Sequence, residues 1–309
     1  MSSAFTPLSD PIAALADAQG AGVLAVITGV EGPSYRPLGA CMAIMTDGHR
    51  VGSLSSGCIE ADVSLHAMTC LSDNRPSRLL YGQGSPFADI QLPCGGGLEI
   101  TLLPNPDPAV LVQLQKAKTE RRAVNMSIDA DRPAIAIAPP GQTGWYDGLF
   151  HVLIEPGLRF FVFGKGPEAS TFAAIAHSSD YETLLLSPDA ETRAYAQDIG
   201  CAVQGLDKMA FPNHLAADAY SAIVLFFHDH EWEPPILLGA LQTPAFYIGA
   251  QGSRRARDAR LSALQELGAS PRQLDRLKGP IGLVPSARDA RTLAISVLSE
   301  ILMIAHQAK

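Results

Sequence analysis

The chain has 309 residues, of which 47% are hydrophobic and 17% are charged, so it can bury a sizeable core and does not have the composition of a disordered protein. Its 31 acidic and 23 basic residues give a formal net charge of -8, which argues against a duplex nucleic-acid binder but not against a small anionic ligand. At about 150 residues per domain, this length predicts two domains. Neither a secretory signal nor an apolar run of the roughly 20 residues that a membrane span needs is visible, so we expect a cytoplasmic protein without a membrane segment. The five cysteines are odd in number, which argues against a disulfide scaffold.

The first half of the chain predicts a mixed α/β domain over residues 1–155. Its hydrophobic pattern and its turn residues indicate both element types, and Asp47-Gly48 is a strong hairpin signal between two of the strands. We expect helices over residues 10–19, from about 58 to 71 and 107–118, and strands over 22–28, 40–46, 51–54, 98–103, 134–138 and 149–154.

The second half, residues 156–309, follows a Pro156-Gly157 boundary and alternates strands with helices. We expect strands over residues 160–163, 182–186, 222–227 and 245–248, and helices over 168–176, 192–199, 234–241, 254–267 and 287–306. The strands are nearly continuous apolar runs, as in a parallel sheet that helices cover on both faces. The second domain is therefore predicted to be a Rossmann-like, doubly wound parallel sheet.

A glycine turn at the first strand of this domain matches the dinucleotide fingerprint G-x-G-x-x-A, which begins at Gly164. Gly166 would let a pyrophosphate approach the backbone. Pro167, however, lacks an N–H group, Glu168 adds a negative charge, and Asp189 lies two places beyond the position where NAD-binding proteins usually carry an acid. The turn thus predicts the fold, and an NAD(P)-dependent oxidoreductase remains an alternative function.

Two cysteines lie in glycine-rich turns. Cys58 follows Gly57 at the expected start of a helix, where the helix dipole favours the reactive thiolate. Cys94 precedes Gly95 and Gly96, whose backbone N–H groups are suited to an anion. The spacing of the two thiols does not fit a structural zinc site. They are either cofactor contacts or small buried residues of tight turns.

The other cysteines, Cys41, Cys70 and Cys201, lie in apolar strand-like or helical contexts, and we expect them in the core. Arg36 lies in a proline-stiffened loop, where it either clamps a phosphate or is a solvated surface charge.

The apolar strand over residues 222–227 ends in His228, Asp229 and His230. Ligands of open α/β sheets bind at the carboxyl ends of the strands, so these side chains are candidates for ligand contacts. A metal site is disfavoured because no third ligand follows at a recognisable spacing. The alternative is a capping acid with exposed histidines.

A second polar cluster follows the next strand, where Gly252 and Ser253 precede Arg254 and Arg255 at the expected start of a helix. Helix N–H groups together with arginines suit a phosphate. The alternative is a surface helix whose arginines pair with an acid or with water.

Taken together, these motifs resemble the XdhC/CoxI family, the accessory factors of xanthine dehydrogenase and related molybdenum hydroxylases. The resemblance covers nearly the whole chain and rests on residues 32–40, 52–60, 94–96, 228–230, 247–255 and 279–283. It implies an N-terminal XdhC/CoxI domain and a C-terminal Rossmann domain in a homodimer. It also implies a chaperone, with no turnover of its own, that binds molybdenum cofactor (molybdopterin or a dinucleotide form), protects it during sulfuration by a cysteine desulfurase and delivers it to the apo-hydroxylase.

The residues that we predict to contact the cofactor come from both halves of the chain. They are Arg36, Gly57, Cys58, Glu60, Cys94, Gly95, Gly96, Gly164, Gly166, His228, Asp229, Gly252, Ser253, Arg254 and Arg255, with Cys58 and Cys94 as possible molybdenum contacts. The chain departs from the family pattern where Ser56-Gly57 replaces two glycines, where Lys165 and Pro167 stand in the glycine turn, and where Ser187 replaces an acid.

Overall fold

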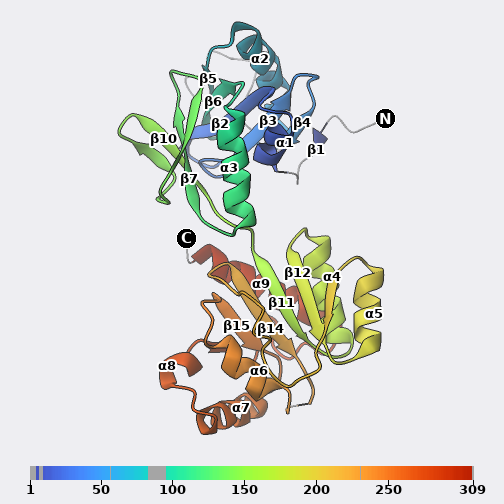
Figure 1. Cartoon of the computed structure of the whole chain (residues 1–309). Helices are drawn as coiled ribbons and strands as arrows, with labels where there is room; N and C mark the ends of the chain where they lie inside the picture. The colour runs from blue at the N-terminus through green and yellow to red at the C-terminus, as the bar shows by residue number, and fades with distance from the viewer. Residues whose placement is uncertain (1–4, 7–9, 56, 83–94, 230, 308–309) are drawn as a thin grey trace. The chain divides into compact units, whose positions relative to one another are not determined.

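The computed structural model describes residues 5–6, 10–55, 57–82, 95–229 and 231–307 (Figure 1). The chain divides into two compact units, Met1–Pro156 (unit 1) and Gly157–Lys309 (unit 2). The predicted contact Cys94 and the candidate His230 lie outside the described residues, as does Ser56. Among the described helices, none has the length and apolar character needed to cross a membrane.

The described residues of unit 1 form two sheets and three helices. The six-stranded sheet has the order β1(Phe5–Thr6), β4(Arg50–Gly52), β3(Cys41–Met45), β2(Gly22–Glu31), β6(Gly97–Pro104), β5(Ser77–Tyr81). The four-stranded sheet has the order β8(Ala134–Ala138), β7(Val124–Asp129), β10(Leu149–Ile154), β9(Gly144–Tyr146). The helices are α1(Pro11–Asp17), α2(Glu60–Asp73) and α3(Pro108–Thr119).

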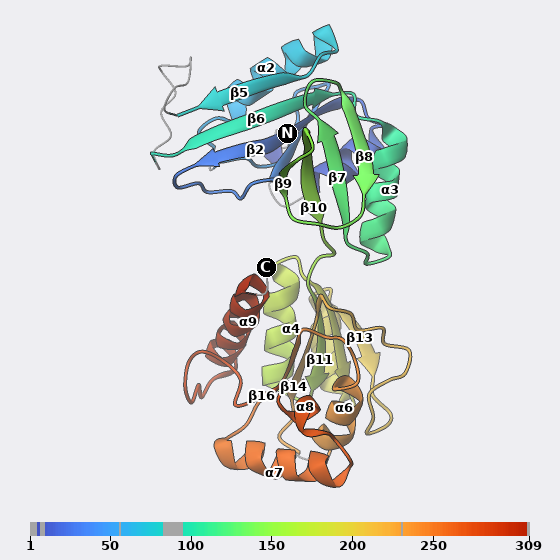
Figure 2. The same cartoon turned by 90° about the vertical axis from the view of Figure 1, so that its left-hand side faces the viewer.

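Helix α2 and the four-stranded sheet cover opposite faces of the six-stranded sheet (Figure 2). The alternation of side chains along β2 explains both layers. Val23 and Ala25 pack on the α2 side, whereas Leu24 and Val26 pack with α1, α3 and the smaller sheet. The two hydrophobic cores thus cover both faces of the six-stranded sheet, and its loops carry polar residues.

The described residues of unit 2 form one sheet of parallel strands. Its order is β13(Ala202–Gly205), β12(Glu182–Ser187), β11(Arg159–Gly164), β14(Ser221–Phe226), β15(Tyr247–Ala250), β16(Leu277–Lys278). In chain order within the unit this is 3-2-1-4-5-6, the Rossmann order. The predicted Rossmann-like parallel sheet is therefore confirmed.

Helices cover both faces of this sheet. One face packs against α4(Pro167–Ser178), α5(Ala190–Asp198) and α9(Ala290–Gln307), and the other packs against α6(Glu233–Ala240) and α7(Arg254–Glu266). The short helix α8(Pro271–Leu274) precedes β16. The strands β11 and β14 are buried on both faces, which accounts for their apolar sequences.

The sequence patterns missed β5, β7, β9, β13, α8 and β16, which are short, polar or partly exposed. They also placed the start of α2 too early. The helix begins at Glu60, so Cys58 lies in the loop before it rather than in its first turn.

Candidate functional site

One edge of the six-stranded sheet in unit 1 gathers the predicted contacts of that unit. Strands β2 and β3 are antiparallel, as are β3 and β4, and β6 is antiparallel to β2 and β5. The end of β2, the start of β3, the end of β4 and the start of β6 therefore meet at the same edge. The loops over residues 32–40 and 53–59, together with Gly95 and Gly96, form what we call the loop edge.

Gly96 packs against the loop that carries Arg36. A Cβ atom on Gly96 would lie 2.1 Å from the Pro33 carbonyl oxygen, so only glycine fits there. Beyond Pro33, the Ser34 hydroxyl donates to the Arg36 carbonyl oxygen over 2.8 Å and orders the loop. The side chains of Tyr35 and Arg36 are exposed on it. The fold thus packs Gly96 against the start of the loop that carries Arg36.

Glu60 organises the loop that carries Cys58. Its buried carboxylate accepts bonds from the Ser55 N–H (2.7 Å), the Ser55 hydroxyl (2.6 Å) and the Ser53 hydroxyl (3.0 Å). Cys58 is exposed, and its N–H donates to the Ser55 hydroxyl oxygen over 3.1 Å. Burial raises the pKa of Glu60, but the bonds from Ser55 and Ser53 outweigh burial and hold that pKa below its ordinary value.

These bonds give Glu60 a structural role. Its carboxylate oxygens accept bonds from donors of its own loop, and Glu60 is only 2% exposed. Glu60 therefore shapes the loop that carries Cys58, and its contact with a cofactor stays a prediction.

The remaining described cysteines are unsuited to contact a ligand. Cys70 and Cys201 are buried, as predicted, and Cys41 is partly buried. Burial raises the pKa of the Cys41 thiol to about 12 and that of Cys70 to about 11, so both stay protonated near neutral pH. Cys58 is the exposed thiol of the described part of the chain.

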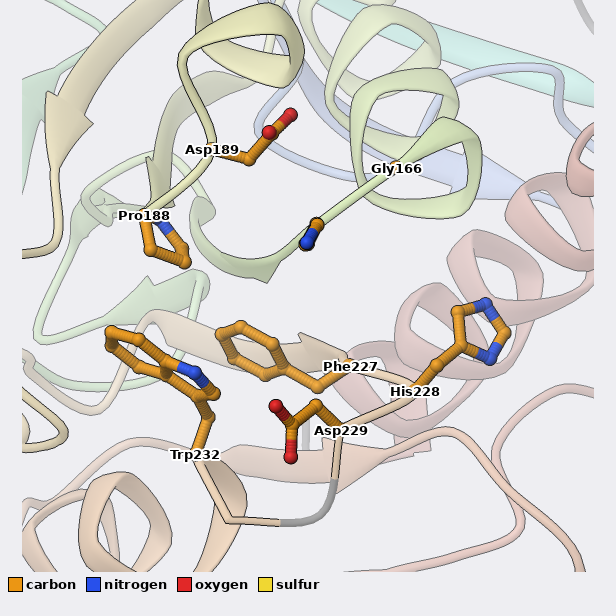
Figure 3. A pocket seen from close by; sticks show the side chains of 8 residues that line it. Gly166, Pro188, Asp189, Phe227, His228, Asp229 and Trp232 are labelled. Atoms are coloured by element: carbon orange, nitrogen blue, oxygen red, sulfur yellow. The ribbon is translucent and has the colours of Figure 1, made fainter.

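Unit 2 has a hollow at the carboxyl ends of β11, β12 and β14 (Figure 3). Its volume is about 440 Å³, within the range of small-molecule sites. The rings of Phe227 and Trp232 are stacked 5.8 Å apart and form one wall, and Pro188 and Asp189 lie opposite. The Asp229 carboxylate lies beside the rings, whereas the His228 imidazole is directed away from them. We call this space the aromatic hollow.

The glycine turn beside the aromatic hollow is closed by its own bonds. The Lys165 N–H donates to the Phe226 carbonyl oxygen over 3.1 Å, and the Gly166 N–H donates to the Thr192 hydroxyl oxygen over 2.9 Å. Pro167, the next residue, has no N–H group. The N–H groups of Lys165 and Gly166 are thus occupied and Pro167 has none, which argues against the NAD(P) alternative and against a phosphate contact of Gly166.

Gly164 serves the fold instead. A Cβ atom there would lie 2.6 Å from the Phe226 carbonyl oxygen and 2.7 Å from the Ala169 Cβ, so the glycine allows α4 to pack closely on the sheet. The small residue Ala169 has the same effect from the helix side. In unit 2, Gly164 and Ala169 of the G-x-G-x-x-A pattern therefore serve the packing of α4 on the sheet.

A second hollow of about 970 Å³ lies at the carboxyl ends of β14 and β15. Its wall includes the predicted residues His228, Gly252, Ser253 and Arg254, but Arg255 is not part of it. The segment 280–289 supplies the opposite wall, with Arg288 among its residues. We call this space the arginine hollow.

His228 belongs to both hollows and pairs with Glu168 across 3.4 Å. The described residues contain no group of three or more histidine, cysteine or acidic side chains that could hold a metal ion.

A buried ion pair supports the wall between the two hollows. Arg260 donates to both carboxylate oxygens of Glu233, over 3.0 and 3.1 Å, and to the Gln251 carbonyl oxygen over 2.7 Å. Gln251 in turn donates through its amide to the Phe227 carbonyl oxygen. The charges of Arg260 and Glu233 are 2% and 1% exposed, so the pair ties α6 and α7 to the strand ends.

The sequence patterns missed Trp232, Lys165 and Arg288 as wall residues. Trp232 is one of two tryptophans of the chain and follows His228 closely, which is the signal that could have revealed it. Arg288 lies in a segment that turns back on the sheet, and nothing local in the sequence indicates this.

Comparison with known proteins gives the same family for both units. Residues 160–301 match the XdhC Rossmann domain, and residues 15–82 match the XdhC and CoxI family. The chain is 32% identical to a protein of Escherichia coli named molybdenum cofactor insertion chaperone PaoD, over 97% of this chain and 88% of that one. It is 24% identical to a Bacillus subtilis protein named as a probable subunit of xanthine dehydrogenase, over 94% of each.

A crystal structure from Bacillus halodurans, described as a xanthine dehydrogenase, has the same fold with a TM-score of 0.79 over 97% of both chains, at 20% identity. Three observations indicate the same family: the motifs at the loop edge, the strand order of unit 2 and the similarity to the Escherichia coli relative. The chain belongs to the XdhC and CoxI family.

Proposed function

We propose that the chain is an accessory protein that binds molybdenum cofactor at the loop edge of unit 1 and hands it to a molybdenum hydroxylase. The observation that carries this proposal is that the loops with Arg36 and Cys58 and the Gly95–Gly96 pair adjoin strand ends on the same side of one sheet. The name of the Escherichia coli relative, a molybdenum cofactor insertion chaperone, supports it.

The residues at the loop edge suit the two ends of this cargo. The cofactor ends in a phosphate, and a guanidinium such as that of Arg36 binds phosphate through paired, charge-assisted hydrogen bonds. Backbone N–H groups of a glycine turn add donors for the same anion. At the other end, a soft sulfur ligand such as the Cys58 side chain suits molybdenum and its sulfur ligands. Cys94 is proposed as a second thiol of the site.

Binding at the loop edge would serve transfer rather than turnover. In our proposal the protein shields the cofactor while a cysteine desulfurase sulfurates it, and then delivers it to apo xanthine dehydrogenase or a related hydroxylase. We further propose that the protein works as a homodimer in the cytoplasm.

The test is the retention of cofactor by the purified full-length chain. Wild type and the variants Cys58→Ala and Cys58→Ser are produced in a molybdate-fed host, and pterin and molybdenum are measured per chain. We expect retention in the wild type and at least a fivefold loss in both variants. Cys201→Ala, which changes a buried thiol of unit 2, is the matched control and retains the cofactor.

Two outcomes would count against the proposal. Wild type that carries neither pterin nor molybdenum argues against binding altogether. Unchanged retention in Cys58→Ala and also in Cys94→Ala removes the thiols from the mechanism and leaves Arg36 and the glycine turn as the contacts to be varied next.

A further inference from the structure

We infer that unit 2 binds a nucleoside phosphate in an orientation different from the Rossmann mode, with the base in the aromatic hollow and the phosphate in the arginine hollow at Arg254 and Arg288. Unit 2 carries this site by itself, whatever unit 1 binds. The glycine turn, where a Rossmann domain holds a pyrophosphate, takes no part in it.

The first reason is that residues 165–167 of the glycine turn offer no amide to a phosphate. The N–H groups of Lys165 and Gly166 already donate within the protein, and Pro167 has none. The donors for a phosphate in unit 2 are therefore expected elsewhere.

The second reason is the cationic wall of the arginine hollow. Arg254 begins α7 and Arg288 lies on the opposite segment, so two guanidinium groups from separate elements border one space. The described residues include no carboxylate that forms an ion pair with either of them. A cation in the first turn of a helix is unfavourable for the helix dipole, and an anion bound there would offset this cost.

The acids that border the arginine hollow are already occupied. Glu168 pairs with His228, and the Asp289 carboxylate accepts the Thr292 N–H over 2.9 Å. The bond from Thr292 holds the pKa of Asp289 below its ordinary value, so this acid stays ionised at the start of α9. Arg254 and Arg288 are therefore the charged groups available to bind a negatively charged group of a ligand.

The third reason is the fixed position of the segment 280–289. The Ser296 hydroxyl accepts the Val284 N–H over 2.7 Å, and the Glu300 carboxylate accepts bonds from the Gly282 N–H and from the Tyr247 hydroxyl. This segment is therefore anchored to α9 and β15 and keeps the hollow open without a ligand.

The aromatic hollow has the chemistry of a base and ribose site. Phe227, Trp232 and Pro188 offer flat apolar surfaces, on which a base can stack. Asp189 and Asp229 offer acceptors for amino or hydroxyl groups. Because Phe227 and His228 belong to the walls of both hollows, a nucleotide can reach from one into the other.

Nucleoside diphosphates (ADP, GDP and CDP) test the inference with the full-length chain. Trp232 fluorescence is followed in a Trp145→Phe background, because the chain has two tryptophans, and calorimetry is run in parallel. We expect saturable quenching by at least one of the three nucleotides. Free nucleotides contain no pterin, so this outcome is separate from the retention of molybdenum cofactor.

Four variants locate the phosphate. Arg254→Ala and Arg288→Ala should each weaken binding at least tenfold, whereas Arg255→Ala, which removes the neighbouring arginine outside the hollow, should change it by less than twofold. Lys165→Ala, which changes a wall residue of the aromatic hollow, should weaken binding less than Arg254→Ala does. The inference is overturned if no nucleotide binds at millimolar concentration, if Arg255→Ala weakens binding as much as Arg254→Ala, or if Lys165→Ala has the larger effect.

Discussion

The Gly166 N–H donates to the Thr192 hydroxyl, 2.9 Å away, and so closes the turn that gives unit 2 its dinucleotide fingerprint. Thr192 is itself fixed, because its hydroxyl donates to the Asp189 carboxylate over 2.5 Å. Asp189 also caps α5 by accepting the Thr192 N–H. A motif that in other proteins exposes amides to a ligand is here part of the packing between two helices and the sheet.

Thr192→Val tests this bond. Valine has the shape of threonine but no hydroxyl, so the Gly166 N–H loses its partner and unit 2 should lose about 1–3 kcal/mol in free energy of unfolding. Urea unfolding followed through Trp232 in the Trp145→Phe background measures the loss. Thr192→Ser keeps the hydroxyl and should lose less. Equal stability of Thr192→Val and wild type would show that the bond contributes nothing.

The buried pair of Arg260 and Glu233 yields a second prediction. Arg260→Ala leaves the Glu233 charge buried and the Gln251 carbonyl without its donor, so the cost should be about 3–5 kcal/mol. The double variant Arg260→Met with Glu233→Leu should cost less than the sum of the two single changes, because neither charge is left alone. Additive losses in chemical denaturation would contradict the coupling.

Glu60 makes the stability of unit 1 dependent on pH. The pKa of Glu60 is lowered in the folded protein, so its ionised form stabilises the fold at and above the ordinary value of 4.5, and this contribution is lost as the pH falls below that value. Glu60→Gln should cost about 2 kcal/mol at pH 7. The gap between variant and wild type should narrow between pH 5 and pH 3. A gap that stays constant across this range would argue against the assigned role.

Gly96→Ala tests the contact between the glycine turn and the Arg36 loop. The added methyl group would meet the Pro33 carbonyl oxygen, which is backbone and cannot move away freely. We expect a loss of about 1–3 kcal/mol in free energy of unfolding, together with reduced retention of cofactor. Gly157→Ala is the matched control, since a Cβ atom there meets nothing within 4 Å. Equal effects of the two changes would exclude the proposed contact.

Periodicity and turn residues predicted the parallel sheet of unit 2 because its central strands are buried on both faces and read as apolar runs. They missed β5 and β7, in which polar residues such as Arg78 and Asn125 interrupt the pattern. These strands gain their stability from neighbours that are distant in the sequence, which a local pattern does not contain.

The candidate sites also divide into features that the local sequence predicted and features that depend on tertiary packing. The position of Arg254 at the start of α7 followed from its local cap, whereas Cys58, expected at the start of a helix, lies in the loop before α2. The closure of the glycine turn by Thr192, which is 26 positions away, and the burial of Arg260 against Glu233, 27 positions away, depend on how helices pack on the sheet. That Arg255 does not line the arginine hollow could likewise not be predicted locally, because it depends on the direction in which α7 leaves β15.

The most direct measurement of the central claim is an anaerobic titration of the purified apo chain with molybdenum cofactor released from a hydroxylase. We predict saturation near one cofactor per chain, read as bound molybdenum and pterin after gel filtration. Arg36→Ala should weaken this binding at least tenfold, while Arg255→Ala, outside the loop edge, should leave it unchanged. Absence of saturable binding to the wild type, or equal binding by wild type, Cys58→Ala and Arg36→Ala, would contradict the account.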